Sequence, residues 1–385
     1  MSPSAPPTPS PAAAPSVAFD VGPLHGPRTG VGNAVTWTLD ALRRCGDVEL
    51  MPYVTSMRAR LDGETRRLPM PAAVAQRWWP HWSPPLDRLL GTPDVVHGTN
   101  YVVPPTRCPR LVSVYDCWFL EHPELAAPDV RRSADVLRRA VGDGATVVAS
   151  SNATAARVRD LLETDRVHTV LLGPPPQTDA VPAIESDDET GPRTETDNVT
   201  DDAPYVLAIG TIERRKNFPL LVKAFARVCA EHPSARLVIA GRRGDDSAAL
   251  ERALWLLDRT TVARITVVDE VDEATKQRLL AGAAALVYPS LDEGFGFPIL
   301  EAAQAGVPVV ATTAGSIPEI ARNAALLSEP SDVDALAANI HWALTDPVMA
   351  RKLVTRGTRN LARFSWEKTA AELSALYVEL ADGAR

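Results

Sequence analysis

Two glutamates, Glu293 and Glu301, stand on either side of a glycine-rich stretch. The residues between them begin with Gly294, Phe295, Gly296, Phe297 and Pro298. Glycine allows positive φ and close backbone approach, and proline suits the first helical position, so this stretch predicts a turn that opens a helix. Free N–H groups at a helix start bind anions. We therefore expect an anion site with Glu293 in the loop and Glu301 about one turn inside the helix. The alternative is two surface carboxylates flanking a loop.

A second element joins two cations, Arg215 and Lys216, to the end of an apolar run over 205–209 that stops at Gly210. An apolar-periodic segment over 218–228 follows, so the order is strand, loop, helix. Open α/β sheets bind ligands at the carboxyl ends of their strands. Arg grips two oxygens and Lys acts as a point charge, which suits a diphosphate. Taken alone, the segment could also be a solvated charge cluster.

Together these elements resemble the retaining, nucleotide-sugar-dependent GT-B glycosyltransferases, whose Glu-x7-Glu signature the pair Glu293 and Glu301 matches. The resemblance covers 17–381 and is strongest in the C-terminal half. It implies an α/β fold of two Rossmann-like domains that face a central cleft. The alternation of strand and helix signals after the cations independently favours a parallel sheet with helices on both faces.

The resemblance also implies residue roles. Glu293 and the loop amides after it would hold the donor sugar, Glu301 would bind the ribose hydroxyls, and Arg215 with Lys216 would clamp the diphosphate. The donor-binding residues it implies are Gly30, Gly32, Gly210, Arg215, Lys216, Val271, Gly294, Phe295, Gly296, Phe297, Pro298 and Glu301. The donor is a substrate, so no cofactor is expected.

In the N-terminal half, a short strand over 17–21 leads to a glycine-rich loop that holds Gly30 and Gly32. Strand, glycine loop and helix can cradle a pyrophosphate, but Asn33 and its neighbours lack the third glycine of a dinucleotide fingerprint. A plain loop is the alternative. In the resembled family this loop faces the donor phosphates across the cleft.

Two further strands, 94–101 and 111–116, end in polar residues that we expect at one edge of the sheet. Asn100 and Tyr101 close the first and are candidate acceptor-binding residues; Tyr115 and Asp116 close the second and join Glu293 as candidate catalytic residues. The family commonly has His-Asp where this chain has Tyr115-Asp116. Tyrosine, with a pKa near 10, is a poor base. Asp116 could position an acceptor hydroxyl or cap a turn.

The length of 385 residues suits two α/β domains, and no run of 18 or more apolar residues appears. The net charge is −8, and the acidic stretch 178–204 accounts for nearly all of it. The expected divisions are a disordered tail (1–15), an acceptor-binding domain (16–177), an acidic flexible linker (178–203), a nucleotide-sugar domain (204–364) and a helix that crosses back to the N-terminal domain (365–385).

The four cysteines have no metal-like spacing, and the seven histidines are scattered singly. The cysteines fit reduced thiols in the cytoplasm, and we expect neither a metal site nor nucleic-acid binding.

Three tryptophans, Trp78, Trp79 and Trp82, lie beside a stretch rich in arginine. Amphipathic rings next to positive charge are typical of peripheral contact with a membrane or a lipid-linked acceptor, here at the inner face of the cell membrane. The alternative is that these rings are core anchors.

The expected function is retaining hexosyl transfer from a sugar nucleotide, with GDP-mannose first, to a glycan or lipid-linked hydroxyl. The tracts 97–101 and 210–213 look like those of bacterial mannosyltransferases of polysaccharide assembly. One rival is a non-catalytic binding subunit of the same fold. The other, a nicotinamide-dependent oxidoreductase, needs a complete Gly-x-Gly-x-x-Gly motif that this chain lacks.

Overall fold

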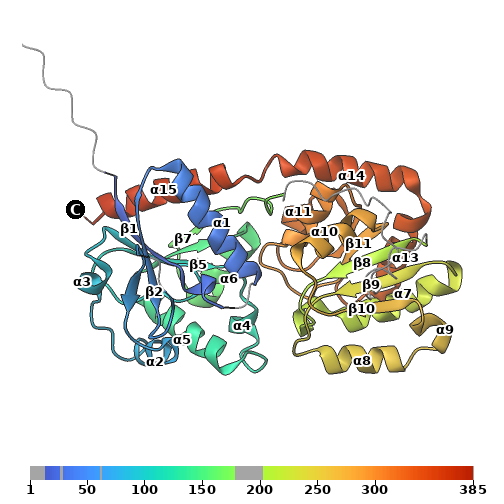
Figure 1. Cartoon of the computed structure of the whole chain (residues 1–385), viewed down its shortest axis with the longest axis horizontal. Coiled ribbons are helices and arrows are strands. Elements are labelled where there is room, and N and C mark those ends of the chain that lie inside the picture. The colour runs from blue at the N-terminus through green and yellow to red at the C-terminus, as the bar shows by residue number, and fades with distance from the viewer. Residues whose placement is uncertain (1–13, 27–28, 61–62, 178–202, 385) are drawn as a thin grey trace, which may run out of the picture.

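The computed structural model describes residues 14–26, 29–60, 63–177 and 203–384. Two α/β domains lie side by side along the long axis of the molecule (Figure 1). This confirms the predicted fold class. The tail and most of the acidic linker expected from the sequence lie outside the described residues.

The N-terminal domain is built on a seven-stranded parallel sheet of order β3-β2-β1-β4-β5-β6-β7. Residues 17–19 of β1, an inner strand of this sheet, are wholly buried, as expected where helices cover both faces. The strands are β1 (Ser16–Asp20), β2 (Glu49–Thr55), β3 (Arg66–Leu68), β4 (Val95–Gly98), β5 (Arg110–Val114), β6 (Thr146–Ala149) and β7 (Val167–Thr169). The helices are η1 (Gly22–Leu24), α1 (Gly30–Cys45), α2 (Ala72–Trp78), α3 (Asp87–Leu90), α4 (Trp118–Glu121), α5 (Pro128–Gly142) and α6 (Asn152–Leu162).

The C-terminal domain has a six-stranded parallel sheet of order β10-β9-β8-β11-β12-β13. Its strands are β8 (Tyr205–Ile209), β9 (Arg236–Ala240), β10 (Ile265–Val268), β11 (Ala285–Tyr288), β12 (Val309–Thr312) and β13 (Ala325–Ser328). Its helices are η3 (Arg214–Lys216), α7 (Phe218–Glu231), α8 (Ser247–Trp255), α9 (Arg259–Val262), α10 (Glu273–Gly282), α11 (Phe297–Ala305), α12 (Ile317–Ala321), α13 (Val333–Thr345) and α14 (Pro347–Leu361). The predicted strand over 205–209 forms as β8, and strands and helices alternate after it as expected.

The last helix, α15 (Trp366–Asp382), runs from the C-terminal domain along the N-terminal one (Figure 1). Two hydrogen bonds hold it against the N-terminal domain. Nε1 of Trp366 donates to the carbonyl of Pro174 at 2.7 Å, and the Tyr377 hydroxyl lies 2.6 Å from Nδ1 of His97. The helix therefore ties the two domains together.

The three tryptophans do not share one environment. Trp79 is 4% exposed and belongs to the core of the N-terminal domain, so including it in a membrane-facing set was wrong. Trp78 and Trp82 are 54% and 61% exposed, and their ring centroids are 6.0 Å apart. Trp78 ends α2 and Trp79 is its C-cap, and successive residues of a helix are turned by about 100° around its axis, so one ring reaches the core while the other stays exposed.

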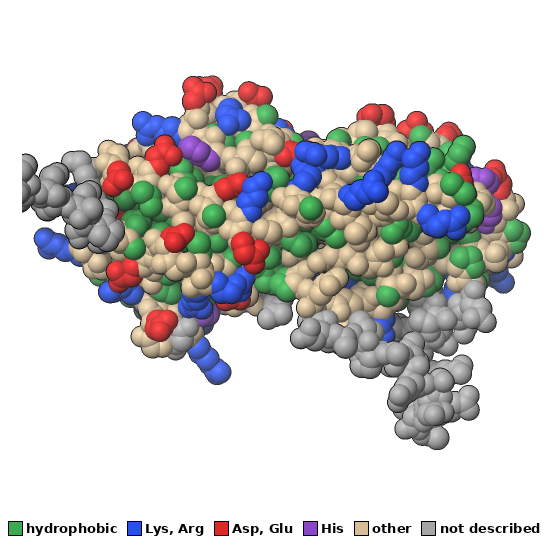
Figure 2. Space-filling view, turned by 90° about the horizontal axis from the view of Figure 1, so that it is seen from above, with side chains coloured by type: hydrophobic (Ala, Val, Ile, Leu, Met, Phe, Trp, Pro, Cys, Tyr) green, Lys and Arg blue, Asp and Glu red, His purple; other side chains and the backbone are tan. Residues whose placement is uncertain are grey.

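None of the helices in the described part of the chain combines the length and apolar character needed to span a bilayer. Acidic and basic side chains are interspersed over the face seen in Figure 2.

Candidate active site

Glu293 lies in the loop between β11 and α11 and is only 5% exposed. Its Oε1 accepts from Nζ of Lys216 and from Oγ of Ser290, each at 2.6 Å. Its Oε2 accepts from Nη1 of Arg215 at 2.6 Å. The structure thus brings the first glutamate and both cations into direct contact. Ser290 also contacts Glu293, and nothing in the sequence pointed to it except its place after a predicted strand.

The turn between β8 and α7 positions the cations. A Cβ on Gly210, where φ is 145°, would lie 3.3 Å from Cε of Lys216, so the glycine leaves room for that side chain. Asn217 follows η3 in the left-handed region, with φ of 56°. Its Nδ2 donates to the carbonyls of Pro289 and Pro330, at 3.2 and 3.0 Å. These bonds fix the turn against the end of β11.

The electrostatics of this cluster favour a charged carboxylate. Burial alone would raise the pKa of Glu293, but the charges of Arg215 and then Lys216 outweigh it and lower the pKa to about 2. Burial lowers the pKa of Lys216, with Glu293 opposing it. Arg215 and the buried Lys216 thus share the Glu293 carboxylate, and Nη2 of Arg215 also lies 3.5 Å from Oε2 of Glu213.

Glu301 lies in α11, as predicted, and its partner is Lys276 of α10, whose Nζ donates to Oε1 at 2.6 Å. Burial raises the pKa of Glu301, and Lys276 opposes that rise. The side chains of Glu301 and Lys276 line a cavity of about 220 Å³ together with Glu273. Val271, a predicted donor contact, lies in the loop before α10 and packs against the core instead of lining this cavity. The pairing of Lys276 was missed because nothing in the sequence links it to α11.

Gly294 and Gly296 have different structural roles in the glycine-rich loop. Gly296 is the N-cap of α11 and has φ of 99°, which favours glycine. Gly294 instead allows close approach, because a Cβ there would lie 1.5 Å from the carbonyl oxygen of Tyr115 in the other domain. Phe295 is buried, and its ring centroid lies 5.1 Å from that of Phe297, the first residue of α11. Pro298 is therefore the second helical residue, one later than predicted.

Gly30 and Gly32 are in the first turn of α1, so the expectation of a loop there was wrong. Thr29 is the N-cap, and its Oγ1 accepts from the Gly32 amide at 3.1 Å. This helix start faces the C-terminal domain, because the ring of Trp37 in α1 meets that of Phe297 edge-on at 5.5 Å.

Tyr115 and Asp116 directly follow the carboxyl end of β5. Burial raises the pKa of Tyr115 beyond its usual range, so its phenol cannot serve as a base near neutral pH. Oδ1 of Asp116 accepts from the Trp118 amide at 3.2 Å, which is the turn-capping role left open by the sequence. Burial lowers the pKa of Arg215, but Glu293 and then Asp116 outweigh it and raise that pKa.

Asn100 and Tyr101 follow β4 at the same edge. The Tyr101 hydroxyl donates to Oδ2 of Asp116 at 3.2 Å, and its ring packs 4.7 Å from that of Phe119. Tyr101 has φ of 59°, an unusual backbone state for a bulky residue, and such states are frequent at ligand sites. Oδ1 of Asn100 is buried without a hydrogen-bond partner. Of the two, Asn100 is the side chain with an acceptor still to be satisfied.

Several contacts between the domains lie around the start of α6, a segment that no sequence pattern indicated. Ser150 and Thr154 donate to the carbonyl of Gly294 at 3.1 and 3.2 Å. Arg157 donates to Asp292 at 2.6 Å. Glu319 of α12 accepts from the first two amides of α6, each at 3.0 Å. The loop that holds Glu293 is thus docked on the N-terminal domain.

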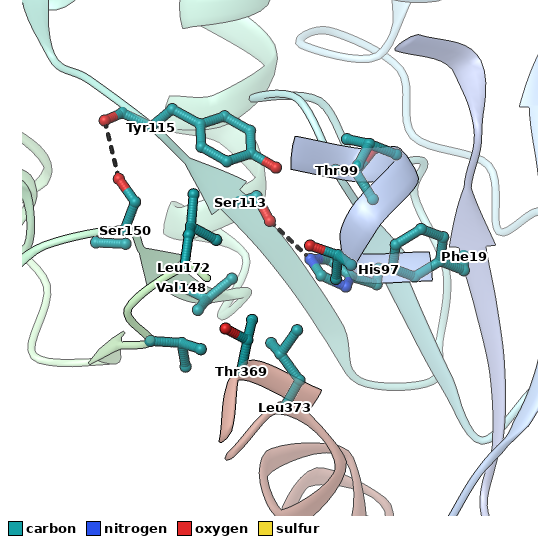
Figure 3. Close-up of a pocket in the computed structure, with 14 residues that line it drawn as sticks. Phe19, His97, Thr99, Ser113, Tyr115, Val148, Ser150, Leu172, Thr369 and Leu373 are labelled. Carbon is teal, nitrogen blue, oxygen red and sulfur yellow. Dashed lines mark hydrogen bonds between the residues drawn. The ribbon is translucent and has the colours of Figure 1, made fainter. Parts of the chain in front are cut away.

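Behind Tyr115, a narrow cavity lies between the sheet and α15 (Figure 3). Nε2 of His97 lies 2.9 Å from Oγ of Ser113, and the Tyr115 ring points toward Thr99. Burial lowers the pKa of His97 to about 3, so the ring stays neutral. With its partner on α15, His97 supports the domain packing and does not reach the cations.

The family model described as "Glycosyl transferases group 1" matches residues 194–360. O-antigen chain mannosyltransferase B of Escherichia coli is 37% identical over 176 residues, which are 45% of this chain and 45% of that protein. MMP alpha-(1->4)-mannosyltransferase of Mycolicibacterium hassiacum is 41% identical over 103 residues, 26% of this chain and 25% of that protein. The chain thus spans less than half the length of the curated relatives it matches.

Among solved structures, sucrose-phosphate synthase from Thermosynechococcus elongatus is similar with a TM-score of 0.68, covering 95% of this chain and 99% of that one at 19% identity. WaaG, a glycosyltransferase involved in lipopolysaccharide biosynthesis, has a TM-score of 0.68, covering 94% and 99% at 16% identity. At these identities the likeness concerns the fold. The chain therefore has the GT-B fold, and over residues 194–360, which match the glycosyl transferases group 1 model, it resembles bacterial mannosyltransferases.

Proposed function

We propose that this chain is a retaining hexosyltransferase that uses a sugar nucleotide as donor and a glycan or lipid-linked hydroxyl as acceptor. The observation that carries the proposal is the contact of Glu293 with both Arg215 and Lys216 in front of α11. A carboxylate and two cations at a helix start can bind a sugar and a diphosphate side by side.

The cations would act on the leaving group. As the bond between the sugar C1 and the phosphate oxygen breaks, negative charge grows on the diphosphate. Arg215, Lys216 and the first turn of α11 are fixed before the reaction, so they stabilise this charge without reorganising. This arrangement supplies the field that a divalent cation supplies in other transferases, so we propose transfer without a metal.

Glu293 would act on the sugar. Its low pKa keeps it charged, which favours an oxocarbenium-like state next to it. The acceptor oxygen then bonds to C1 on the face that the phosphate leaves, and the leaving phosphate takes the acceptor proton. This route needs no protein base, in agreement with the high pKa of Tyr115.

The nucleoside and the sugar are assigned by different evidence. Glu301 and Lys276 would bind the ribose hydroxyls, and the cavity beside them offers room for more of the nucleoside. Mannose is our first choice because relatives of the C-terminal domain include bacterial mannosyltransferases. GDP-mannose is the donor to test first. We place the enzyme in the cytoplasm, with peripheral membrane contact when the acceptor is lipid-linked.

Titration with ADP, GDP, UDP and dTDP, followed by thermal shift, tests donor binding first. Turnover is then measured with GDP-mannose in excess EDTA, and NMR gives the anomeric configuration of the product. Retained configuration and EDTA-resistant turnover support the proposal. Binding without turnover of any sugar nucleotide would instead favour a non-catalytic subunit, and full rescue by Mg²⁺ or Mn²⁺ after chelation would overturn the metal-free mechanism.

A further inference from the structure

A cluster of two histidines and one glutamate lies on the C-terminal domain, away from the cleft. Glu231 ends α7, His232 follows it as the C-cap, and His341 lies on α13. One ligand atom from each residue lies within 4.8 Å of the other two. Residues 232 and 341 are 109 positions apart, so only the packing of α7 against α13 brings them together.

The contacts within this cluster converge on one nitrogen. Nδ1 of His341 lies 2.8 Å from Nε2 of His232 and 2.8 Å from Oε2 of Glu231. A carboxylate only accepts, and each neutral imidazole has one N–H and one lone pair. Nδ1 of His341 can therefore offer its two neighbours either one shared N–H or one lone pair. A cation at the same place would satisfy all three lone pairs at once.

The donor set defines the class of cation. Two imidazole nitrogens and one carboxylate oxygen suit Zn²⁺ and related borderline metals, whereas Mg²⁺ and Ca²⁺ prefer oxygen ligands. The site is also accessible, because the side chains of His341 and Glu231 are 37% and 67% exposed. Its floor is apolar, since Val228 of α7 and Ile340 of α13 are buried in the same core cluster.

We propose that Glu231, His232 and His341 form a binding site for Zn²⁺ or a similar divalent transition metal that clips α7 to α13. α7 is 14 residues long, and its first turn follows directly after Lys216. At 1.5 Å per residue, the metal would lie about 20 Å from the cations of the cleft. The site is thus separate from the transfer chemistry, and its effect is on the stability of the domain.

Zn²⁺ titration by calorimetry, after EDTA treatment and removal of the chelator, tests this site. The protein carries Cys45→Ser, because Cys45 is an exposed thiol that could bind the ion itself. We expect one equivalent to bind and the melting temperature to rise with Zn²⁺ concentration. His341→Ala should lose that equivalent and the rise. His168→Ala, at an exposed histidine of β7, should keep both.

Glu231→Gln is a second variant that should fold like the parent. Glu231 is exposed, and the glutamine side chain has nearly the same size. It should melt like the parent in EDTA but bind Zn²⁺ more weakly. Equal Zn²⁺ binding by the parent, His341→Ala and Glu231→Gln would overturn the proposal, as would the absence of any bound equivalent in the parent.

Discussion

Gly294, in the loop between β11 and α11, lies very close to the backbone of Tyr115. A Cβ on Gly294 would lie 1.5 Å from the carbonyl oxygen of Tyr115. The two residues belong to different domains. Ser150 donates to both carbonyls, at 3.2 Å to Tyr115 and 3.1 Å to Gly294. The position of Glu293 beside the N-terminal domain therefore depends on a glycine next to it.

Gly294→Ala should keep the domains from reaching this arrangement. The clash is with backbone, which cannot turn aside as a flexible side chain can. We expect nucleoside diphosphate binding to persist, because the cations are in the C-terminal domain, while kcat/KM falls roughly 100-fold through misplacement of the reacting groups. Gly142→Ala is the matched control, since a Cβ there meets nothing within 4 Å. Equal activity of the two variants would contradict the role of this contact.

Lys216→Ala should weaken nucleoside diphosphate binding by about 1.5–3 kcal/mol, the range for a lost charge-assisted hydrogen bond. Calorimetry with the tightest-binding nucleotide measures this. Lys223→Ala, at an exposed position of α7, removes the same charge from the surface and should change the affinity little. Unchanged affinity of Lys216→Ala for every nucleotide would remove Lys216 from the clamp.

The two glutamates should differ in kinetics. Glu293→Gln keeps the volume but not the charge, so we expect kcat to fall roughly 100-fold with a smaller change in nucleotide affinity. Glu301→Ala should mainly raise the donor KM, because ribose hydrogen bonds are lost in both ground and transition states. Steady-state kinetics with the donor varied separates the two effects. Identical changes in kcat and KM would show that the residues share one role.

The elements of this site could be predicted from the sequence because their signals are local. The order of strand, glycine turn and helix around Glu293, and the cations after 205–209, are each read within a few residues. The start of α1 at Gly30 could also have been predicted, since Thr29 is a good N-cap residue. The glycines favoured a loop there instead.

The partners of the site residues could not be predicted, since they come from distant parts of the chain. Lys276 reaches Glu301 from a neighbouring helix, and Arg157 reaches Asp292 from the other domain. Burial was equally hidden. Nothing local distinguishes Trp79 from Trp78, and the histidines at 232 and 341 are scattered in sequence but adjacent in space.

Asp20 gives a prediction about pH and stability. Burial raises its pKa from 3.8 to about 7, with the hydrogen bond from the Gly22 amide opposing the rise. Between these values the folded protein keeps a proton that the unfolded chain has released. Stability from this group is therefore present at low pH and declines as pH rises through the window, by at most about 1.4 kcal/mol per pH unit.

Asp20→Asn should remove this decline, because an amide is neutral at every pH and its oxygen can still accept from Gly22. Relative to the parent, the variant should gain stability from pH 4 to pH 7 and hold the gain above it. Urea unfolding at each pH unit measures the difference. Parallel curves for parent and variant would show that Asp20 does not titrate in this range.

Trp78 and Trp82 test membrane contact. Arg77, the residue before Trp78, is also exposed, and such a charge contributes ~1 kcal/mol at an anionic surface. Replacing Trp78 and Trp82 together by Ser should reduce sedimentation with vesicles rich in anionic lipid, leaving the melting temperature and nucleotide binding close to those of the parent. High salt should weaken binding of the parent, since the charges are exposed.

Trp79→Ser provides the contrast, because it removes a buried ring and should cost about 3–5 kcal/mol of stability, judged from large-to-small changes in cores. Its melting temperature should fall while any folded fraction still binds vesicles. If the parent never sediments with anionic vesicles, the exposed tryptophans have no membrane role. If the double variant melts as low as Trp79→Ser, the two rings contribute to packing instead, because loss of an exposed ring alone leaves the core intact.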